Sequence, residues 1–200
     1  MSTSFRFLPA SRGILMRLRT QLNLVRRGKE VLEMRREQLI KRLFELIDKV
    51  KERSNIEAKY VHILREANRL RVMYGDENYS SIASLVSPPK VEVLLMSVEG
   101  VVVPQIKVVE EPDFSSVSEP EYRRMFSEMW NVLKMLIDLV NLENTVERLS
   151  RQLSYINRVV NSLEKKVIPN LQEAIRYVEE KVHEEMLEEF VRISKSRGVQ

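Results

Sequence analysis

Two long stretches of heptad-spaced apolar residues, separated by a short proline-rich segment, constrain the fold of this 200-residue chain most strongly. In the first, apolar residues recur at steps of three and four over residues 15–74. In the second, the same spacing extends over residues 126–193. Such spacing draws one apolar stripe along a helix and is typical of a coiled-coil seam. Because a lone helix cannot bury its stripe, we expect the two helices to pack against each other.

The first stripe predicts one helix over residues 13–74, with Gly75 suited to a left-handed C-terminal cap. Two consecutive steps of three between Val50 and Ile56 form a stammer, which overwinds a coiled coil locally. The predicted seam positions are Leu15, Leu18, Leu22, Val25, Lys29, Leu32, Arg36, Leu39, Leu43, Leu46, Val50, Arg53, Ile56, Tyr60, Ile63, Ala67, Leu70 and Tyr74.

The second helix is predicted to start near Ser118. Ser118 and Glu121 match a capping box, and Pro120 suits the first turn, where its missing N–H costs nothing. Pro169 lies inside the stripe, where a proline removes one backbone hydrogen bond and kinks the helix; beyond it the stripe resumes in a new phase. The predicted seam positions are Phe126, Trp130, Leu133, Ile137, Val140, Leu142, Val146, Leu149, Leu153, Ile156, Val160, Leu163, Val167, Leu171, Ile175, Val178, Val182, Met186 and Ile193.

The segment between the stripes has the pattern of a two-stranded hairpin. Residues 90–98 and 101–109 are short runs rich in β-branched side chains, joined by Glu99 and Gly100. Pro104 would place its strand at an edge, because proline cannot donate to a ladder. Since an isolated hairpin is marginally stable, we expect it to lean on the helices.

The aromatic residues Phe126 and Trp130 are the expected contact for the hairpin, and residues 76–89 and 110–117 are expected to be loops. The fold class is therefore mainly α: a long antiparallel two-helix coiled coil of the N- and C-terminal helices with a small central β-hairpin. One elongated domain is expected, made of an N-terminal helix (1–75), loops and hairpin (76–119) and a C-terminal helix (120–200).

Charge favours the antiparallel arrangement. Residues 1–29 hold seven basic residues and no acidic one, whereas residues 173–189 hold seven Glu against Arg176 and Lys181. Antiparallel packing sets these segments side by side, and complementary flanking charges help to fix orientation. The basic start, with Phe5 and Arg6, also resembles a transit peptide. The apolar spacing continues past residue 29 without a break, which favours a segment belonging to the mature fold.

The sequence offers little for catalysis. It has no Cys, which excludes thiolate metal sites and a cysteine nucleophile, and its two His, His62 and His183, lie far apart. No phosphate-binding glycine motif is present. We therefore expect no catalytic residue, no cofactor and no metal. No apolar run approaches the ~18 residues of a transmembrane helix, so no direct membrane span is expected.

Three basic residues, Lys29, Arg36 and Arg53, interrupt the first stripe. Their long stems could lie along the seam with the charged heads in water, or these points could face another subunit. Periodicity alone does not separate the two interpretations. Met125, Met129 and Met135 are expected to serve packing.

Several motifs resemble those of the D subunit of the archaeal A-type and vacuolar V-type rotary ATPases. Residues 27–39 are similar to the family pattern R-G-x-x-L-L-K-x-K-R-D-x-L, and residues 158–171 to R-R-V-N-A-L-E followed by I-P-x-L. Residues 100–104 resemble G-V-x-V-P, and Arg12 stands where the family has the arginine of P-T-R. The resemblance covers most of the chain.

The resemblance implies a non-catalytic central-stalk rotor that couples ATP synthesis or hydrolysis to ion translocation at the cytoplasmic face of the cell membrane. The implied partners are the catalytic A and B subunits, which surround the two chain ends as a hexamer, the F subunit, and the socket protein (C/d type) on the membrane ring. Nucleotide would be bound by the hexamer. The residues expected to bind partners are Arg12, Gly28, Arg35, Arg36, Arg158, Asn161, Glu164 and Pro169.

A prefoldin-like chaperone, also built as helix, hairpin and helix, is the alternative from a different class. It would need apolar helix tips and several hairpins forming a barrel, whereas the tips here are charged and the hairpin is single. A nucleic-acid-binding arm is a further alternative, resting on residues 1–29. That segment has few aromatics for base stacking, and the Glu-rich segment would neutralise it, so no nucleic-acid partner is expected.

Overall fold

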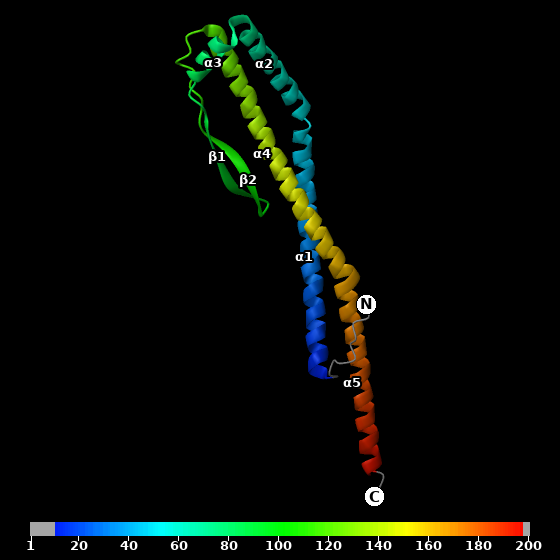
Figure 1. Cartoon of the computed structure of the whole chain (residues 1–200). Helices are drawn as coiled ribbons and strands as arrows, with labels where there is room; N and C mark the ends of the chain where they lie inside the picture. Colours follow the sequence, from blue (N-terminus) through cyan, green and yellow to red (C-terminus); the bar gives the residue numbers. More distant parts are fainter. Residues whose placement is uncertain (1–10, 198–200) are drawn as a thin grey trace. The chain divides into compact units, whose positions relative to one another are not determined.

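The computed structural model describes residues 11–197, so Phe5, Arg6 and the rest of the first ten residues lie outside the described part. The chain is mainly helical with one central hairpin, as predicted (Figure 1). Its elements are α1 (Arg12–Val50), α2 (Arg53–Tyr74), α3 (Asp76–Ser84), β1 (Lys90–Val98), β2 (Val101–Glu110), α4 (Pro120–Ser162), the π-helical turn η2 (Leu163–Val167) and α5 (Ile168–Arg197).

The chain divides into two compact units. The terminal unit combines residues 1–38 with 154–200, and the central unit contains residues 39–153. In the terminal unit, α1 and α5 are antiparallel, because Arg19 pairs with Glu179 whereas Lys29, further along α1, pairs with the earlier Glu164.

The central unit repeats the antiparallel arrangement. Arg53 at the start of α2 pairs with Glu143, and Tyr74 at the end of α2 donates to Glu121 near the start of α4. Antiparallel packing therefore holds within each unit.

The predicted seams are the buried faces of both units. In the terminal unit the buried seam residues include Leu22, Ile156, Val160 and Val178, and in the central unit they include Leu39, Leu43, Leu46 and Leu149.

Phe126 and Trp130 at the start of the second stripe are buried as predicted, but two later positions and the end of the stripe were misassigned. Leu133 and Val140 are exposed and Leu139 is buried instead, so the buried face of α4 lies one position away from the predicted seam there. Met186 and Ile193, predicted to continue the seam, are also exposed. Of the three Met expected to pack, Met125 is buried, Met129 is half-buried and Met135 is exposed.

The prediction of a single helix over residues 13–74 was wrong at one point. Helix α1 ends at Val50, Lys51 and Glu52 form a turn, and α2 begins at Arg53. The Glu52 N–H bonds to the Lys49 carbonyl at 3.3 Å, the tighter three-residue spacing. The break lies at the stammer. The irregular heptad spacing there is therefore accommodated by a turn and not by an overwound continuous helix.

A second correction concerns residues 76–84, which were expected to be a loop. Gly75 has φ 83° and ψ 152°, a positive-φ conformation other than the left-handed helical cap predicted, and α3 follows at once. The helix forms because it buries Ile82 and places the Tyr79 ring against Tyr122 and Phe126. These contacts belong to a small core whose buried members are Ile63, Ala67, Ile82, Val117, Tyr122, Met125 and Phe126.

Helix α4 begins at Pro120, and the Glu121 carboxylate, predicted to complete a capping box, accepts a hydrogen bond from Tyr74 Oη at 2.9 Å. Near Pro169 the helical path continues through the π-helical turn η2. A proline has no N–H to offer, and its ring crowds the carbonyl four residues earlier. A π turn accommodates one extra residue, so η2 absorbs the change of phase that the stripe shows there.

The hairpin matches its predicted bounds, except that β2 extends one residue further, to Glu110. Val98 pairs with Val101, and Glu99 and Gly100 both have positive φ, as a type I′ turn requires. The hairpin lies beside α4, as expected (Figure 1), but the hydrogen-bonded contact is at Asn141, which bonds to Ile106. Of the two predicted contacts, Phe126 packs in the small core instead, and Trp130 is buried.

Candidate interaction surfaces

All eight residues predicted to bind partners lie in the terminal unit. Arg12 is the first residue of α1, and its guanidinium contacts Met186 Sδ on α5 at 2.9 Å. Glu164 lies in the π-helical turn and meets Lys29 at 3.2 Å. Arg12 and Lys29 are 17 positions apart on α1, or roughly 25 Å along the helix. The predicted residues are therefore spread along the unit rather than gathered in one site.

The remaining predicted residues differ in exposure. Arg35 and Arg36 are half-buried on α1, while Arg158, Asn161 and Pro169 are exposed. Gly28 is also exposed, and a Cβ built there would meet nothing within 4 Å. Its lack of a side chain is therefore not required by packing in the terminal unit.

Lys29 is the first of the three basic residues at the predicted seam. Its ammonium group pairs with Glu33 on its own helix at 3.5 Å and with Glu164 across the unit at 3.2 Å. The hydrogen bond to Glu164 is the main cause that raises the pKa of Lys29, partly offset by desolvation. The charged head is therefore held by carboxylates of this chain rather than lying in water, and a contact of this position with another subunit stays a prediction.

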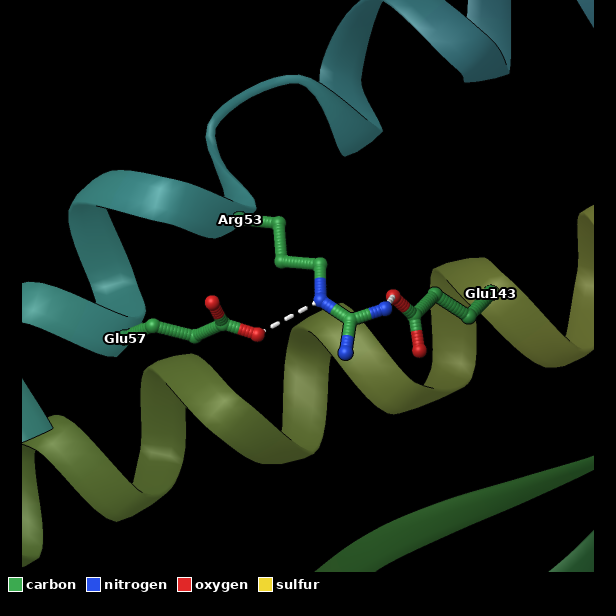
Figure 2. Close-up of polar contacts among 3 residues, drawn as sticks. All are labelled: Arg53, Glu57 and Glu143. Atoms are coloured by element: carbon green, nitrogen blue, oxygen red, sulfur yellow. Dashed lines mark hydrogen bonds and ion pairs between the residues drawn. The ribbon is translucent and has the colours of Figure 1, made fainter.

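Arg53 also pairs with two carboxylates, at the break between α1 and α2. Its partners were not identified from the sequence. Figure 2 shows its guanidinium between two carboxylates: Nε donates to Glu57 Oε1 at 2.7 Å, and Nη1 donates to Glu143 Oε1 at 2.9 Å. The hydrogen bond to Glu57, followed by the charge of Glu143, raises the pKa of Arg53. One side chain thus ties the first turn of α2 to α4 directly after the break.

Asn141 is the second residue that sequence reasoning missed. Its Oδ1 accepts from the Ile106 N–H at 2.7 Å, and its Nδ2 donates to the Ile106 carbonyl at 2.8 Å. An ion pair between Lys134 and Glu111 adds a second link between α4 and the segment after β2. The only available signal was an Asn beside the seam, which does not reveal what it faces.

The described surface offers grooves rather than an enclosed chemical site. The groove between α2 and α4 has about 370 Å³ and an open, mixed-charge lining that includes Arg69, Glu121 and Arg124. Within residues 11–197 no group of three or more His, Cys, Asp or Glu side chains could hold a metal ion. None of the helices described there has both the length and the apolarity to cross a membrane.

Comparisons with known proteins identify the family of this chain. The family model for the ATP synthase D subunit matches residues 14–198. The chain is 29% identical over 197 residues to the A-type ATP synthase D subunit of Halobacterium salinarum (strain ATCC 29341 / DSM 671 / R1), covering 92% of this chain and 87% of that protein. It is 27% identical over 194 residues to the Pyrococcus horikoshii protein of the same name, covering 92% of this chain and 91% of the relative. The chain belongs to the family of ATP synthase D subunits, whose members are components of A/V-type ATP synthases.

Proposed function

We propose that this chain is the central-stalk rotor of an A/V-type ATP synthase, a non-catalytic shaft between the catalytic subunits and the membrane ring. The observation that carries the proposal is the match of the D-subunit family model to residues 14–198. The antiparallel helix pair found within each unit is the kind of element that resists torsion, because twisting it would expose its apolar seam.

Cross-helix contacts support a torsional role. Arg19–Glu179 and Lys29–Glu164 connect the helices of the terminal unit, and Arg53–Glu143 connects those of the central unit. Each exposed pair contributes little to stability, but pairs at intervals fix the register of one helix against the other.

A rotor must also present different faces to its surroundings as it turns. Each unit carries its backbone irregularity on one helix only: the turn at Lys51–Glu52 in the central unit and η2 in the terminal unit. The helix pair is therefore asymmetric about its axis, as an element that distinguishes successive catalytic sites requires.

In this proposal the A and B subunits form a hexamer around the chain ends, the F subunit binds beside the coiled coil, and a C/d-type socket protein links the shaft to the membrane ring. We further propose that the complex lies at the cytoplasmic face of the cell membrane. The eight residues from Arg12 to Pro169 named from the resemblance are proposed as contacts with these partners.

Rotation of the chain inside its complex tests the proposal. The sequence has no Cys, so a single Glu188→Cys variant gives one attachment point on the exposed end of α5. Cross-linking this Cys to one of the A or B subunits with a cleavable reagent should stop ATP hydrolysis, and cleavage of the reagent should restore it. A monofunctional reagent of similar size is the control. Full hydrolysis in the cross-linked complex would reject a rotor at this position.

A further inference from the structure

The two outer edges of the hairpin differ in how far they are blocked. On the outer edge of β2, both backbone groups of Ile106 bond to the Asn141 amide, at 2.7 and 2.8 Å. Ile106 is the register partner of Val93, so this pair does not exchange hydrogen bonds between the strands. Pro104, two residues away, belongs to the same outward-facing class. Its ring nitrogen, which carries no N–H, therefore lies on the outer edge. Asn141 and Pro104 together block the middle of the outer edge of β2.

The same alternation leaves the outer edge of β1 open. Because alternate pairs are hydrogen-bonded, the backbone N–H and C=O groups of Val91, Val93, Leu95 and Ser97 point away from β2. Among residues 11–197, no hydrogen bond reaches these groups. A row of unpaired N–H and C=O groups is a template for another strand.

The side chains of β1 do not protect this edge. Val93 and Leu95 are 67% and 75% exposed on one face, and Leu94 and Met96 are exposed on the other, whereas Val103 on β2 is fully buried. No charged residue or proline occurs from Val93 to Val98. Natural edge strands usually carry such residues to prevent pairing, so an edge without them in a stable protein indicates a partner.

We infer that the outer edge of β1 docks an extended strand from another component of the ATP synthase. A helix has no free backbone groups to offer along its length, whereas an added strand satisfies every outward group of β1 and covers its apolar side chains. The inference rests on family membership and not on the proposed rotation, so the two can fail separately.

A second copy of this chain fits the edge less well. Twofold antiparallel pairing centred on Val93, Leu94 or Leu95 sets Glu92 against an apolar residue, Leu94, Met96 or Val98 respectively. Centring on Glu92 brings two carboxylates together, which is destabilising. The partner strand is therefore a different sequence, with a polar or basic residue facing Glu92 and apolar residues facing Leu94 and Met96.

Amide hydrogen exchange at single-residue resolution, on the isolated chain and on the purified complex, tests the inference. The Leu94 and Met96 amides bond to β2 and should be protected in both samples. The Val93, Leu95 and Ser97 amides should exchange rapidly in the isolated chain and at least about tenfold more slowly in the complex. Equally fast exchange of these outward amides in both samples overturns the inference. Protection of them in the isolated chain that rises with protein concentration indicates self-pairing and also overturns it.

Leu95→Pro separates backbone docking from side-chain contact. The Leu95 N–H points outward, so a proline here blocks the edge while retaining the bonds to β2, as Pro104 does directly opposite. Leu95→Thr is the control, because it removes apolar surface but keeps the N–H. In the complex, Leu95→Pro should abolish the added protection of the Val93 and Ser97 amides, and Leu95→Thr should keep most of it. Retained protection in Leu95→Pro overturns the inference.

A photo-reactive p-benzoylphenylalanine at Val93 gives a test that does not depend on the folding of the proline variant. Irradiation of the intact complex should cross-link this position to an extended segment of another protein of the synthase. Cross-links that join only this chain to itself overturn the inference.

Discussion

Arg53 Nη1 donates to Glu143 Oε1 at 2.9 Å, at the first residue of α2 and directly after the break between Val50 and Arg53. Lys51 and Glu52 form a turn here instead of continuing the helix, so fewer helical hydrogen bonds hold the backbone at this point. The link from Arg53 to α4 holds the resumed helix where its seam can continue. Its main effect is on the position of the helix, since the Arg53 side chain is 56% exposed and Glu143 is 35% exposed, and such pairs add little stability.

Replacing Arg53 by Ala should loosen the break without unfolding the central unit. We expect amide exchange at residues 50–56 to quicken several-fold, with little change in the midpoint of thermal unfolding, because the buried seam is untouched. Arg151→Ala is the matched control, since Arg151 pairs with Glu147 on its own helix. Equal exchange in both variants would show that Arg53 does not hold the break.

Removing the Asn141 amide should release the hairpin from α4. Asn141→Ala leaves two part-buried backbone groups of Ile106 without partners, and two neutral hydrogen bonds contribute about 2 kcal/mol together, or about thirtyfold in local opening. The expected result is faster exchange of the Ile106 amide. Asn141→Asp should be intermediate, because its carboxylate still accepts from the N–H but cannot donate to the carbonyl. Unchanged exchange of the Ile106 amide in Asn141→Ala would show that the Asn141 side chain does not hold the hairpin on α4.

The sequence located the backbone irregularities better than it described them. The stammer near Arg53 and the phase change near Pro169 are visible as miscounts of the heptad repeat, and the structure has an irregularity at each. Periodicity counts residues and not hydrogen bonds, so it could not tell a turn from an overwound helix, or a kink from a π turn.

Tertiary contacts decide the features that the sequence missed. Residues 76–84 are rich in Asp, Asn and Ser, which favour loops, yet they form α3 because Ile82 and Tyr79 reach the small core. The partner of Asn141 is a backbone 35 residues away, and local pattern carries no information about it. The predicted contact residues followed from family motifs, and the structure locates them along the terminal unit without testing their partners.

Gly28 gives a prediction about stability and assembly. It lies inside α1 with open space where a Cβ would stand, so Gly28→Ala should stabilise the isolated chain by ~1 kcal/mol against chemical denaturation. Gly75→Ala is the contrasting variant, because φ 83° at that position disfavours any residue with a Cβ, and it should destabilise.

If Gly28 meets a partner closely, as the proposal holds, Gly28→Ala should also incorporate less well into the purified complex despite its higher stability. The share of variant and wild-type chains recovered after competition for one pool of partner proteins measures this. Equal incorporation would remove Gly28 from the proposed contacts while leaving the stability prediction intact.

The ion pair between Arg71 and Asp76, which joins the end of α2 to the start of α3, predicts an acid-dependent stability. The hydrogen bond from Arg71 lowers the pKa of Asp76, and its charge adds to the effect. The folded pKa thus lies below the unfolded value of about 4, so the stabilisation is present above that pH and is lost as pH falls through the folded pKa. Unfolding midpoints of wild type and Asp76→Asn should differ at pH 6, and the difference should shrink as pH falls below about 4. Arg71→Gln should show the same trend, and the double variant should add little. A wild-type advantage that persists undiminished to pH 3 would mean that Asp76 does not stabilise the fold through its charge.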